Sequence, residues 1–443
     1  MNKIAIILLS ICMVFSVTSC TNVNDYSQGG IDSEVKNSKK DIETIRINIG
    51  ETYDIFEGNK YYDDINIKWE VSEKSVADLR NSKFILGLNT GITDMKITYP
   101  EGVKKYHIEV EDANTNRAVY EDINNEDSDI IDGIGYGINV IQAEGASEEE
   151  IQKMKPILNV NKMIKDEKIL YSEENAVEYT SINGETIREF VSNYCELYSA
   201  SVGGGIGKLF SAGAKVSYEK SINKLENSNY SINKYSTLVK ILKVFFRENS
   251  DNYCKYLCGE EADYENREIW KELIGTDEKH TSVEDFIKKY GTHIIVSGDF
   301  GGRADLNYVV SAKKSQSSEK SVKETTTTIK TFFTKTKTKK SIDEILKTAE
   351  VNNVSVDFYS KAEGGDTKRY SLDSLGNYNN NFEKWMDSIS EQNSTLINFE
   401  NASLYPIWNL LTDKYKDRKE EFKKYVEISI QKKYDESIIQ RGR

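Results

Sequence analysis

The stretch that decides the fold is Tyr290-Gly291-Thr292-His293-Ile294-Ile295, followed by Gly298 and then by Gly301-Gly302. Just before it, residues 283–290 carry apolar side chains at helical spacing, which predicts a helix that Gly291 ends. The β-branched run at 292–296 then predicts the start of a strand. The three later glycines place backbone without side chains in that strand, so it can bend sharply or accept another backbone closely.

His293 is the residue of this stretch that could serve as a base or a metal ligand. The other two histidines, His107 and His280, lie far from it in the sequence, and no GxSxG, HExxH or nucleotide-binding loop occurs. A histidine at a junction between a helix and a strand is usually a hydrogen-bonded structural residue. We therefore predict no catalytic residue, no metal, no cofactor and no enzymatic activity.

Further landmarks follow in a fixed order along the chain. They are Gly133-Ile134-Gly135-Tyr136-Gly137-Ile138-Asn139 before the central stretch, and Glu363-Gly364-Gly365, Trp385 and Tyr405-Pro406-Ile407-Trp408 after it, with a predicted helix at 414–434. Together with the Tyr-Gly-Thr-His run, this set resembles the signature of the membrane attack complex/perforin (MACPF) family. The resemblance begins near residue 131, and we assign residues 131–443 to such a domain.

The resemblance implies an α+β fold with a bent four-stranded antiparallel sheet, as in MACPF proteins and cholesterol-dependent cytolysins. It implies two flanking helical clusters that unfurl into amphipathic β-hairpins when monomers assemble into a ring on a bilayer. The implied partners are therefore a target membrane and further copies of the chain. Tyr290, Gly291, Thr292, His293, Gly298, Gly301 and Gly302 would be a structural signature, and Gly364 and Gly365 would be hinge glycines at the bend of the last long strand.

The first candidate inserting segment is residues 201–235, in which apolar and polar side chains largely alternate as a membrane-crossing hairpin requires. Part of it also has helical spacing, as a segment that changes from helix to strand would need. The alternative is a buried strand that runs into a helix and never moves. The candidate membrane-inserting residues are Val202, Ile206, Phe210, Val216 and Tyr218.

The second candidate segment, residues 312–350, is rich in Lys, Ser and Thr, with Thr325 to Thr328 in its middle. Its candidate membrane-inserting residues are Ile329, Phe332 and Phe333, which give only a weakly apolar side. The lysines could line an aqueous lumen or meet anionic head groups, so we expect a negatively charged target surface. The alternative is a solvated surface tract with no role at the membrane.

The N-terminus predicts the compartment. Lys3 and a short apolar stretch precede Val17-Thr18-Ser19-Cys20, which resembles a bacterial lipobox with a signal peptide at 1–19 and lipid on Cys20. Residues 20–42 are polar and predict a flexible tether. We thus expect a lipid anchor on the bacterial surface, on the outer membrane in a Gram-negative cell, or release from it. The net charge of −13 argues against nucleic-acid binding.

Residues 43–112 alternate between apolar and polar side chains in short runs separated by glycines, which predicts a small β-sandwich. The run Lys68-Trp69-Glu70-Val71-Ser72 and the residues after it resemble a group 2 bacterial Ig-like domain, which implies a spacer or adhesive module. Residues 113–130 are acidic without the spacing of a calcium loop, so a linker is the preferred interpretation. Cys254 and Cys258 are spaced for a small disulfide clasp, but two unpaired thiols, alongside Cys195, fit equally well.

The sequence therefore leaves two functions open. The leading hypothesis is a pore-forming effector that oligomerises on a target membrane, inserts two hairpins per subunit and acts as an antibacterial toxin. The second is a surface-anchored adhesion or recognition protein that uses a MACPF-shaped domain without lysing cells. The lipid anchor and the weakly apolar second segment favour the second hypothesis, and a surface receptor is unidentified in either case.

Overall fold

A computed structural model of the chain describes residues 42–55, 68–80, 83–99, 102–112, 131–142, 153–185, 189–190, 193, 230–312, 319–334, 342–370, 378–399 and 403–439. These residues belong to a single compact unit that spans 42–443. The predicted signal peptide, Cys20 and the tether up to residue 41 lie outside the described part, as do the acidic linker at 113–130 and Cys195.

The N-terminal module, residues 42–112, contains two small β-sheets. One sheet has the order β1 (Glu43–Asn48), β7 (Gly102–Glu111), β6 (Gly91–Tyr99) and β3 (Lys68–Val71), and the other has the order β2 (Thr52–Asp54), β5 (Phe84–Gly87) and β4 (Ala77–Arg80). The period-two pattern arises because alternate side chains, such as Ile45, Ile47, Ile108 and Val110, enter a shared core. This β-rich module fits the predicted small sandwich.

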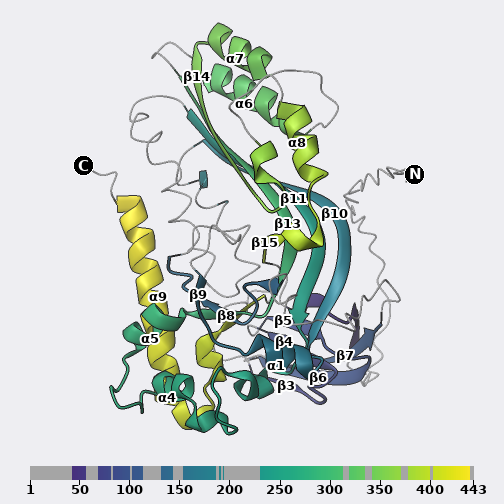
Figure 1. Cartoon of the computed structure of the whole chain (residues 1–443), viewed down its shortest axis with the longest axis vertical. Coiled ribbons are helices and arrows are strands. Elements are labelled where there is room, and N and C mark those ends of the chain that lie inside the picture. Colours follow the sequence, from purple (N-terminus) through teal and green to yellow (C-terminus); the bar gives the residue numbers. More distant parts are fainter. Residues whose placement is uncertain are drawn as a thin grey trace, which may run out of the picture. The chain divides into compact units, whose positions relative to one another are not determined.

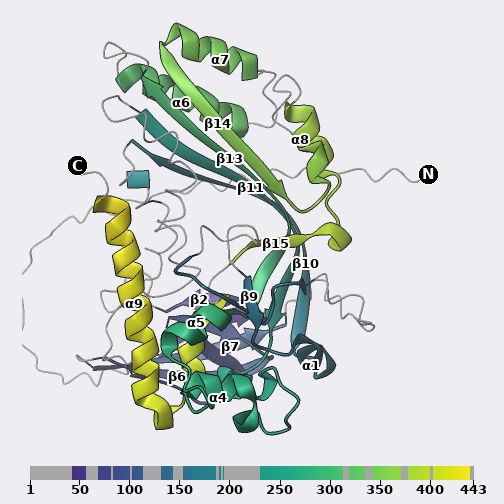
Figure 2. The ribbon, with the colours of Figure 1, turned by 60° about the vertical axis from the view of Figure 1, so that its left-hand side comes forward.

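The central sheet consists of long antiparallel strands. Its order is β10 (Ile169–Gly184), β11 (Tyr230–Phe246), β13 (Ser297–Ala312) and β14 (Val354–Glu363), and β15 (Thr395–Asn398) also pairs with β13. Figures 1 and 2 show that these strands curve strongly along their length. The observed fold is a mixed α+β fold built on a bent antiparallel sheet, which confirms the predicted fold class.

A second, smaller sheet has the order β16 (Leu404–Pro406), β12 (His293–Ile295), β8 (Tyr136–Ile138) and β9 (Lys153–Pro156). The prediction of a continuous strand from Thr292 through the later glycines is therefore wrong. Val296 separates β12 from β13, because its N–H donates to Ser403 O at 2.8 Å while its C=O accepts from Phe246 N at 2.8 Å. These two bonds direct the chain from the small sheet into the central sheet.

Helices flank both sheets. They are α1 (Val160–Lys165), α4 (Glu268–Ile274), α5 (Val283–Tyr290), α6 (Glu319–Thr334), α7 (Ile342–Val351), α8 (Tyr378–Met386) and α9 (Lys416–Ile439). Helix α5 has the predicted bounds, with Ser282 as its N-cap and Gly291 at its end, whereas α9 begins two residues later than the predicted 414–434 helix and extends beyond it. No helix in the described ranges is long and apolar enough to span a bilayer.

Candidate functional site

The signature stretch joins α5 to the small sheet. Gly291 follows α5 with φ of 86°, and a Cβ there would collide with the backbone of Ile138 in β8. The side chain of Thr292 donates to Ile138 O at 3.1 Å and accepts from Val140 N at 3.0 Å. Thr292 thereby satisfies backbone groups at the end of β8, and the motif fixes where β12 begins.

His293 is fully buried in this junction. Its Nδ1 lies 3.0 Å from Thr292 Oγ1, and its ring packs edge-on against Trp408 at a centroid distance of 5.2 Å. Burial lowers the pKa of His293 to about 3, because the charged imidazolium would lose its hydration. The ring is therefore neutral near pH 7 and packed into the core between β12 and the C-terminal segment.

Four glycines from distant parts of the sequence meet in the central sheet, and we call this group the glycine junction: Gly301, Gly302, Gly364 and Gly365. The first two lie within β13, and the second two follow the end of β14 with φ of 67° and 66°. A Cβ on Gly364 would overlap Gly301 O, and a Cβ on Gly301 would overlap Val239 O in β11. The backbones of three neighbouring segments thus approach to a distance that side chains would prevent.

A clasp formed by residues 378–398 holds the glycine junction from outside the sheet. Buried Trp385 in α8 donates from Nε1 to Gly364 O at 2.9 Å, and Gly365 N donates to Asn393 O at 2.9 Å. Asp366 N donates to Ser388 Oγ at 2.8 Å. These bonds fix the backbone of the turn that follows β14.

Strands β14 and β15 share the same edge of β13. Residues Arg303 to Ala312 pair with β14, whereas residues Asp299 to Gly301 pair with β15. The change of partner falls at Gly302, in the middle of the glycine junction. Continuing β14 alongside β13 beyond Arg303 would require β15 to leave this edge.

Charged side chains surround the glycine junction although they are buried. Lys240 Nζ lies 2.8 Å from Asp299 and 3.0 Å from Glu178, which links β10, β11 and β13. Burial alone would raise the pKa of Asp305, but Arg303 at 2.9 Å and Lys234 at 3.2 Å hold that pKa below its usual range. Each of these buried charges therefore has an opposite charge nearby, on the same strand for Arg303 and on a neighbouring strand for Lys234 and Lys240, which makes its burial tolerable.

A family model, that of the MAC/Perforin domain, matches residues 128–438 and so covers well over half of the sequence. The chain belongs to the MAC/Perforin domain family. A search of curated proteins finds no match to it.

Among solved structures, the MAC/Perforin chain is similar to GNIP1Aa from Chromobacterium piscinae, with 16% identity, 68% of this chain covered and a TM-score of 0.49. It is also similar to a putative cell invasion protein with a MAC/Perforin domain from Bacteroides thetaiotaomicron, with 14% identity, 71% of this chain covered and a TM-score of 0.47. The chain spans only 56% and 63% of the lengths of these two proteins.

The helices α6 and α7 of the MAC/Perforin domain occupy the second candidate inserting segment. In both ribbon views they lie at the end of the central sheet where β13 and β14 meet them (Figures 1 and 2). Val322 and Ile329 of α6 pack with Leu306 and Val310 of β13 in a core that is separate from the main one. Thr325, between them on the same face, is also fully buried and accepts from Asn352 Nδ2 at 3.0 Å.

The side chains of the other candidate membrane residues lie outside the described part of the MAC/Perforin chain. Phe332 and Phe333 lie in α6, but their side chains are outside the described part. Val202, Ile206, Phe210, Val216 and Tyr218 lie wholly outside the described residues. Their insertion stays a prediction.

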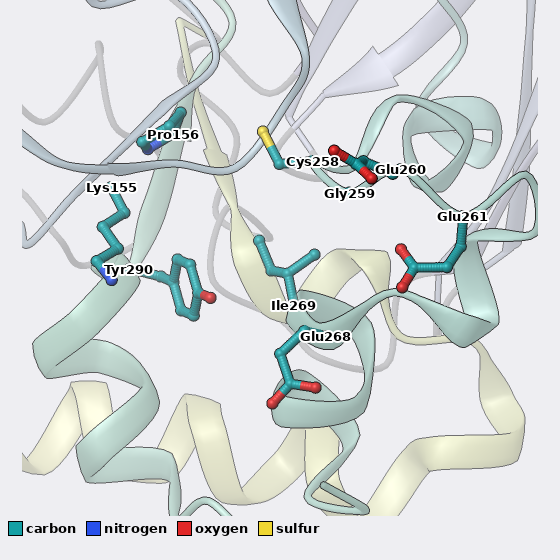
Figure 3. A pocket seen from close by; sticks show the side chains of 9 residues that line it. All are labelled: Lys155, Pro156, Cys258, Gly259, Glu260, Glu261, Glu268, Ile269 and Tyr290. Carbon is teal, nitrogen blue, oxygen red and sulfur yellow. The ribbon is translucent and has the colours of Figure 1, made fainter.

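Beside signature residue Tyr290, the MAC/Perforin domain has an open hollow of about 420 Å³, shown in Figure 3. Lys155 and Tyr290 lie on one side of it, and Glu261 lies on the opposite side. Cys258 also lines this hollow. Cys258 and Cys254 are both free thiols, so the disulfide that their spacing permits is not formed. In the described ranges, no group of three or more His, Cys, Asp or Glu side chains could hold a metal ion.

The sequence alone did not reveal the partners of the glycine junction. The two glycine pairs were visible as landmarks, but their contact with each other depends on the pairing of β13 with β14. The roles of Trp385 and of the buried Lys240 were also missed. Lys234 and Lys240 lie in a run of residues that otherwise favours a buried strand. Because a lysine is rarely buried without an opposite charge, this pattern indicates buried ion pairs in the sheet.

Proposed function

We propose that this MAC/Perforin protein is a pore-forming effector that assembles as a ring on a target membrane and inserts two β-hairpins per subunit. The proposal is supported by the position of the two candidate segments between paired strands of the central sheet. Each segment connects two adjacent antiparallel strands, so changing it into a hairpin would simply lengthen strands that are already paired.

The second segment shows this connection in the described residues. The chain leaves β13 at Ala312, forms α6 and α7, and returns at Val354, which pairs with Ala312. About 40 residues lie between these two ends, and a membrane-crossing strand needs only about 9–11 residues. The connection is therefore long enough for two such strands and a turn.

The first segment has the same topology. Its residues up to 229 belong to the connection between β10 and β11, which are antiparallel and whose ends pair at Gly184 and Ile232, whereas its last residues, 230–235, already form the start of β11. Two hairpins that extend two neighbouring strand pairs would form a continuous four-stranded ribbon in each subunit. Ribbons from successive subunits must close into a barrel, because unpaired strand edges cannot remain in hydrocarbon.

The anchor and the target belong to the same proposal. A lipid on Cys20 would hold the protein on the surface of the producing bacterium, and release would bring it to competing cells as an antibacterial toxin. The exposed lysines of α6, including Lys320 and Lys323, support an anionic target bilayer. Lys320 lies 3.8 Å from Glu324 and Lys323 lies 3.5 Å from Glu185, so straightening α6 would separate both pairs.

A specific observation keeps the adhesion hypothesis as a second candidate. In the described side chains of α6, only Val322 and Ile329 are large apolar residues, and four consecutive threonines lie between them. Such a segment would present a weakly apolar side to lipid. A recognition protein that does not insert into the membrane would not need a more apolar side.

Dye release from liposomes of differing head-group charge separates the two functions. The chain without residues 1–19 should release dye, with anionic liposomes more sensitive than zwitterionic ones, and should form rings visible by electron microscopy. Binding without release on any composition, and without rings, would sink the pore proposal and favour adhesion.

A further inference from the structure

The N-terminal module carries two charged residues that are buried at its boundary with the MAC/Perforin domain. Asp78 and Arg80, both in β4, are 0% and 1% exposed, and Arg80 Nε lies 3.2 Å from Asp78 Oδ2. An arginine and an aspartate on a short strand of a free-standing spacer would normally face water. Their burial therefore indicates that something covers them permanently.

The groups that satisfy these two charges come from the segment that follows β11. Arg80 donates to Glu248 O at 2.6 Å and to the hydroxyl of Tyr253, and its guanidinium also stacks over the Tyr253 ring at 5.0 Å. Ser250 N donates to Asp78 Oδ2 at 3.0 Å. The two charges pair with each other inside the N-terminal module, but their further hydrogen-bonding partners all come from outside it.

The electrostatics agree with this geometry. Burial by itself would lower the pKa of Arg80, but Tyr253 and Asp78 raise it above its ordinary value, so the guanidinium stays charged in the contact. Tyr253 is fully buried and packs against Tyr405 in β16, the edge strand of the small sheet, with ring centroids 4.8 Å apart and ring planes tilted by 60°. Arg80 is therefore connected to the main core through a single aromatic ring.

A backbone contact close by supports the same docking. Gly50 has φ of 82°, and a Cβ on it would lie 2.8 Å from the ring of Phe245, at the end of β11. A side chain at this position would have to adopt a left-handed backbone conformation and would push the Phe245 ring aside, whereas glycine fits without either change. The module therefore contacts both the end of β11, at Phe245, and the segment that follows β11.

We infer that the N-terminal module is a fixed brace on the end of β11, and not an independent spacer, and that the buried Arg80–Asp78 pair couples it to the MAC/Perforin domain. The module and the domain consequently unfold as one cooperative unit. The inference does not rest on pore formation, because an adhesive protein could contain the same brace.

Calorimetry and amide hydrogen exchange of the full chain test the brace. The natural chain should melt in a single transition, and Arg80→Met should separate an N-terminal transition at least about 5 °C below the main one. Exchange at Ser250 N, which donates to Asp78, should accelerate about tenfold or more in Arg80→Met. Lys74→Met is the matched control, since Lys74 pairs with Asp251 at 2.6 Å across the same boundary, but these side chains are 33% and 64% exposed, and the change should alter neither readout.

Two independent transitions in the natural chain, or an Arg80→Met variant that behaves like Lys74→Met, would overturn the brace. If Arg80→Met does not fold, Tyr253→Phe replaces it, because that change removes one acceptor and keeps the ring. Tyr253→Phe should still accelerate exchange at Ser250 N, and unchanged exchange there would equally overturn the inference.

Discussion

The glycine junction predicts an unusually large cost for replacing Gly364 with alanine. Gly364 has φ of 67°, and an L-residue in that conformation costs about 1 kcal/mol. The added Cβ would also overlap Gly301 O and lie 3.0 Å from Gly302 Cα. Backbone cannot rotate away as a side chain can, so β13 or the turn must shift, at a further cost of about 1–3 kcal/mol. The expected total loss of unfolding free energy is about 2–4 kcal/mol.

Gly275→Ala provides the control for this measurement. Gly275 has φ of 72°, nearly the same backbone conformation, but the atoms nearest to its added Cβ lie at 3.5 Å, which is ordinary contact. It should lose only about 1 kcal/mol. Urea denaturation of the full chain at pH 7 measures both variants. Equal losses for Gly364→Ala and Gly275→Ala would refute the close approach of the two glycine pairs.

Two further predictions concern buried charge. Lys240→Met should cost about 3–5 kcal/mol of unfolding free energy, because it leaves Asp299 buried without its lysine partner at 2.8 Å. Glu178→Gln should cost less than about 1 kcal/mol, because the Glu178 side chain is 48% exposed. Denaturation curves of the two variants measure both losses. The pKa of His293 is about 3 in the folded chain and about 6.5 when unfolded, so the unfolded state binds the extra proton and stability is lost as pH falls below about 6.5. His293 should therefore lower the free energy of unfolding by about 2 kcal/mol between pH 7 and pH 5, and this contribution should vanish in His293→Gln. Denaturation at the two pH values measures it. If the variant loses as much stability as the natural chain, the loss does not come from His293.

The sequence predicted the parts of the fold that depend on local chemistry. Helix α5 was found at its observed bounds because the apolar spacing and Gly291 are both local signals. The bent sheet came from the family resemblance, since nothing local says which strands pair. The short break at Val296 was missed, because it depends on a hydrogen bond from Val296 N to Ser403, more than a hundred residues away.

The candidate site was predicted only in outline, for the same reason. Both glycine pairs were singled out, but their approach to each other and to Trp385 arises from the register of β13 with β14 and from the return of α8 to the sheet. The docking of the N-terminal module was also beyond the sequence. No local signal marks Arg80 as buried, because the contacts that cover it come from Tyr253 and Glu248 in a different region.

If the protein opens membranes by unfurling its second segment, α6 must leave the central sheet. Lys323 in α6 lies 3.5 Å from Glu185, directly after β10, so cysteines at these two exposed positions can be joined by a short, cleavable crosslinker. Dye release from anionic liposomes by Lys323→Cys/Glu185→Cys should be abolished when the crosslink is complete and restored when the linker is cleaved. Release that continues undiminished with the crosslink intact would contradict the account.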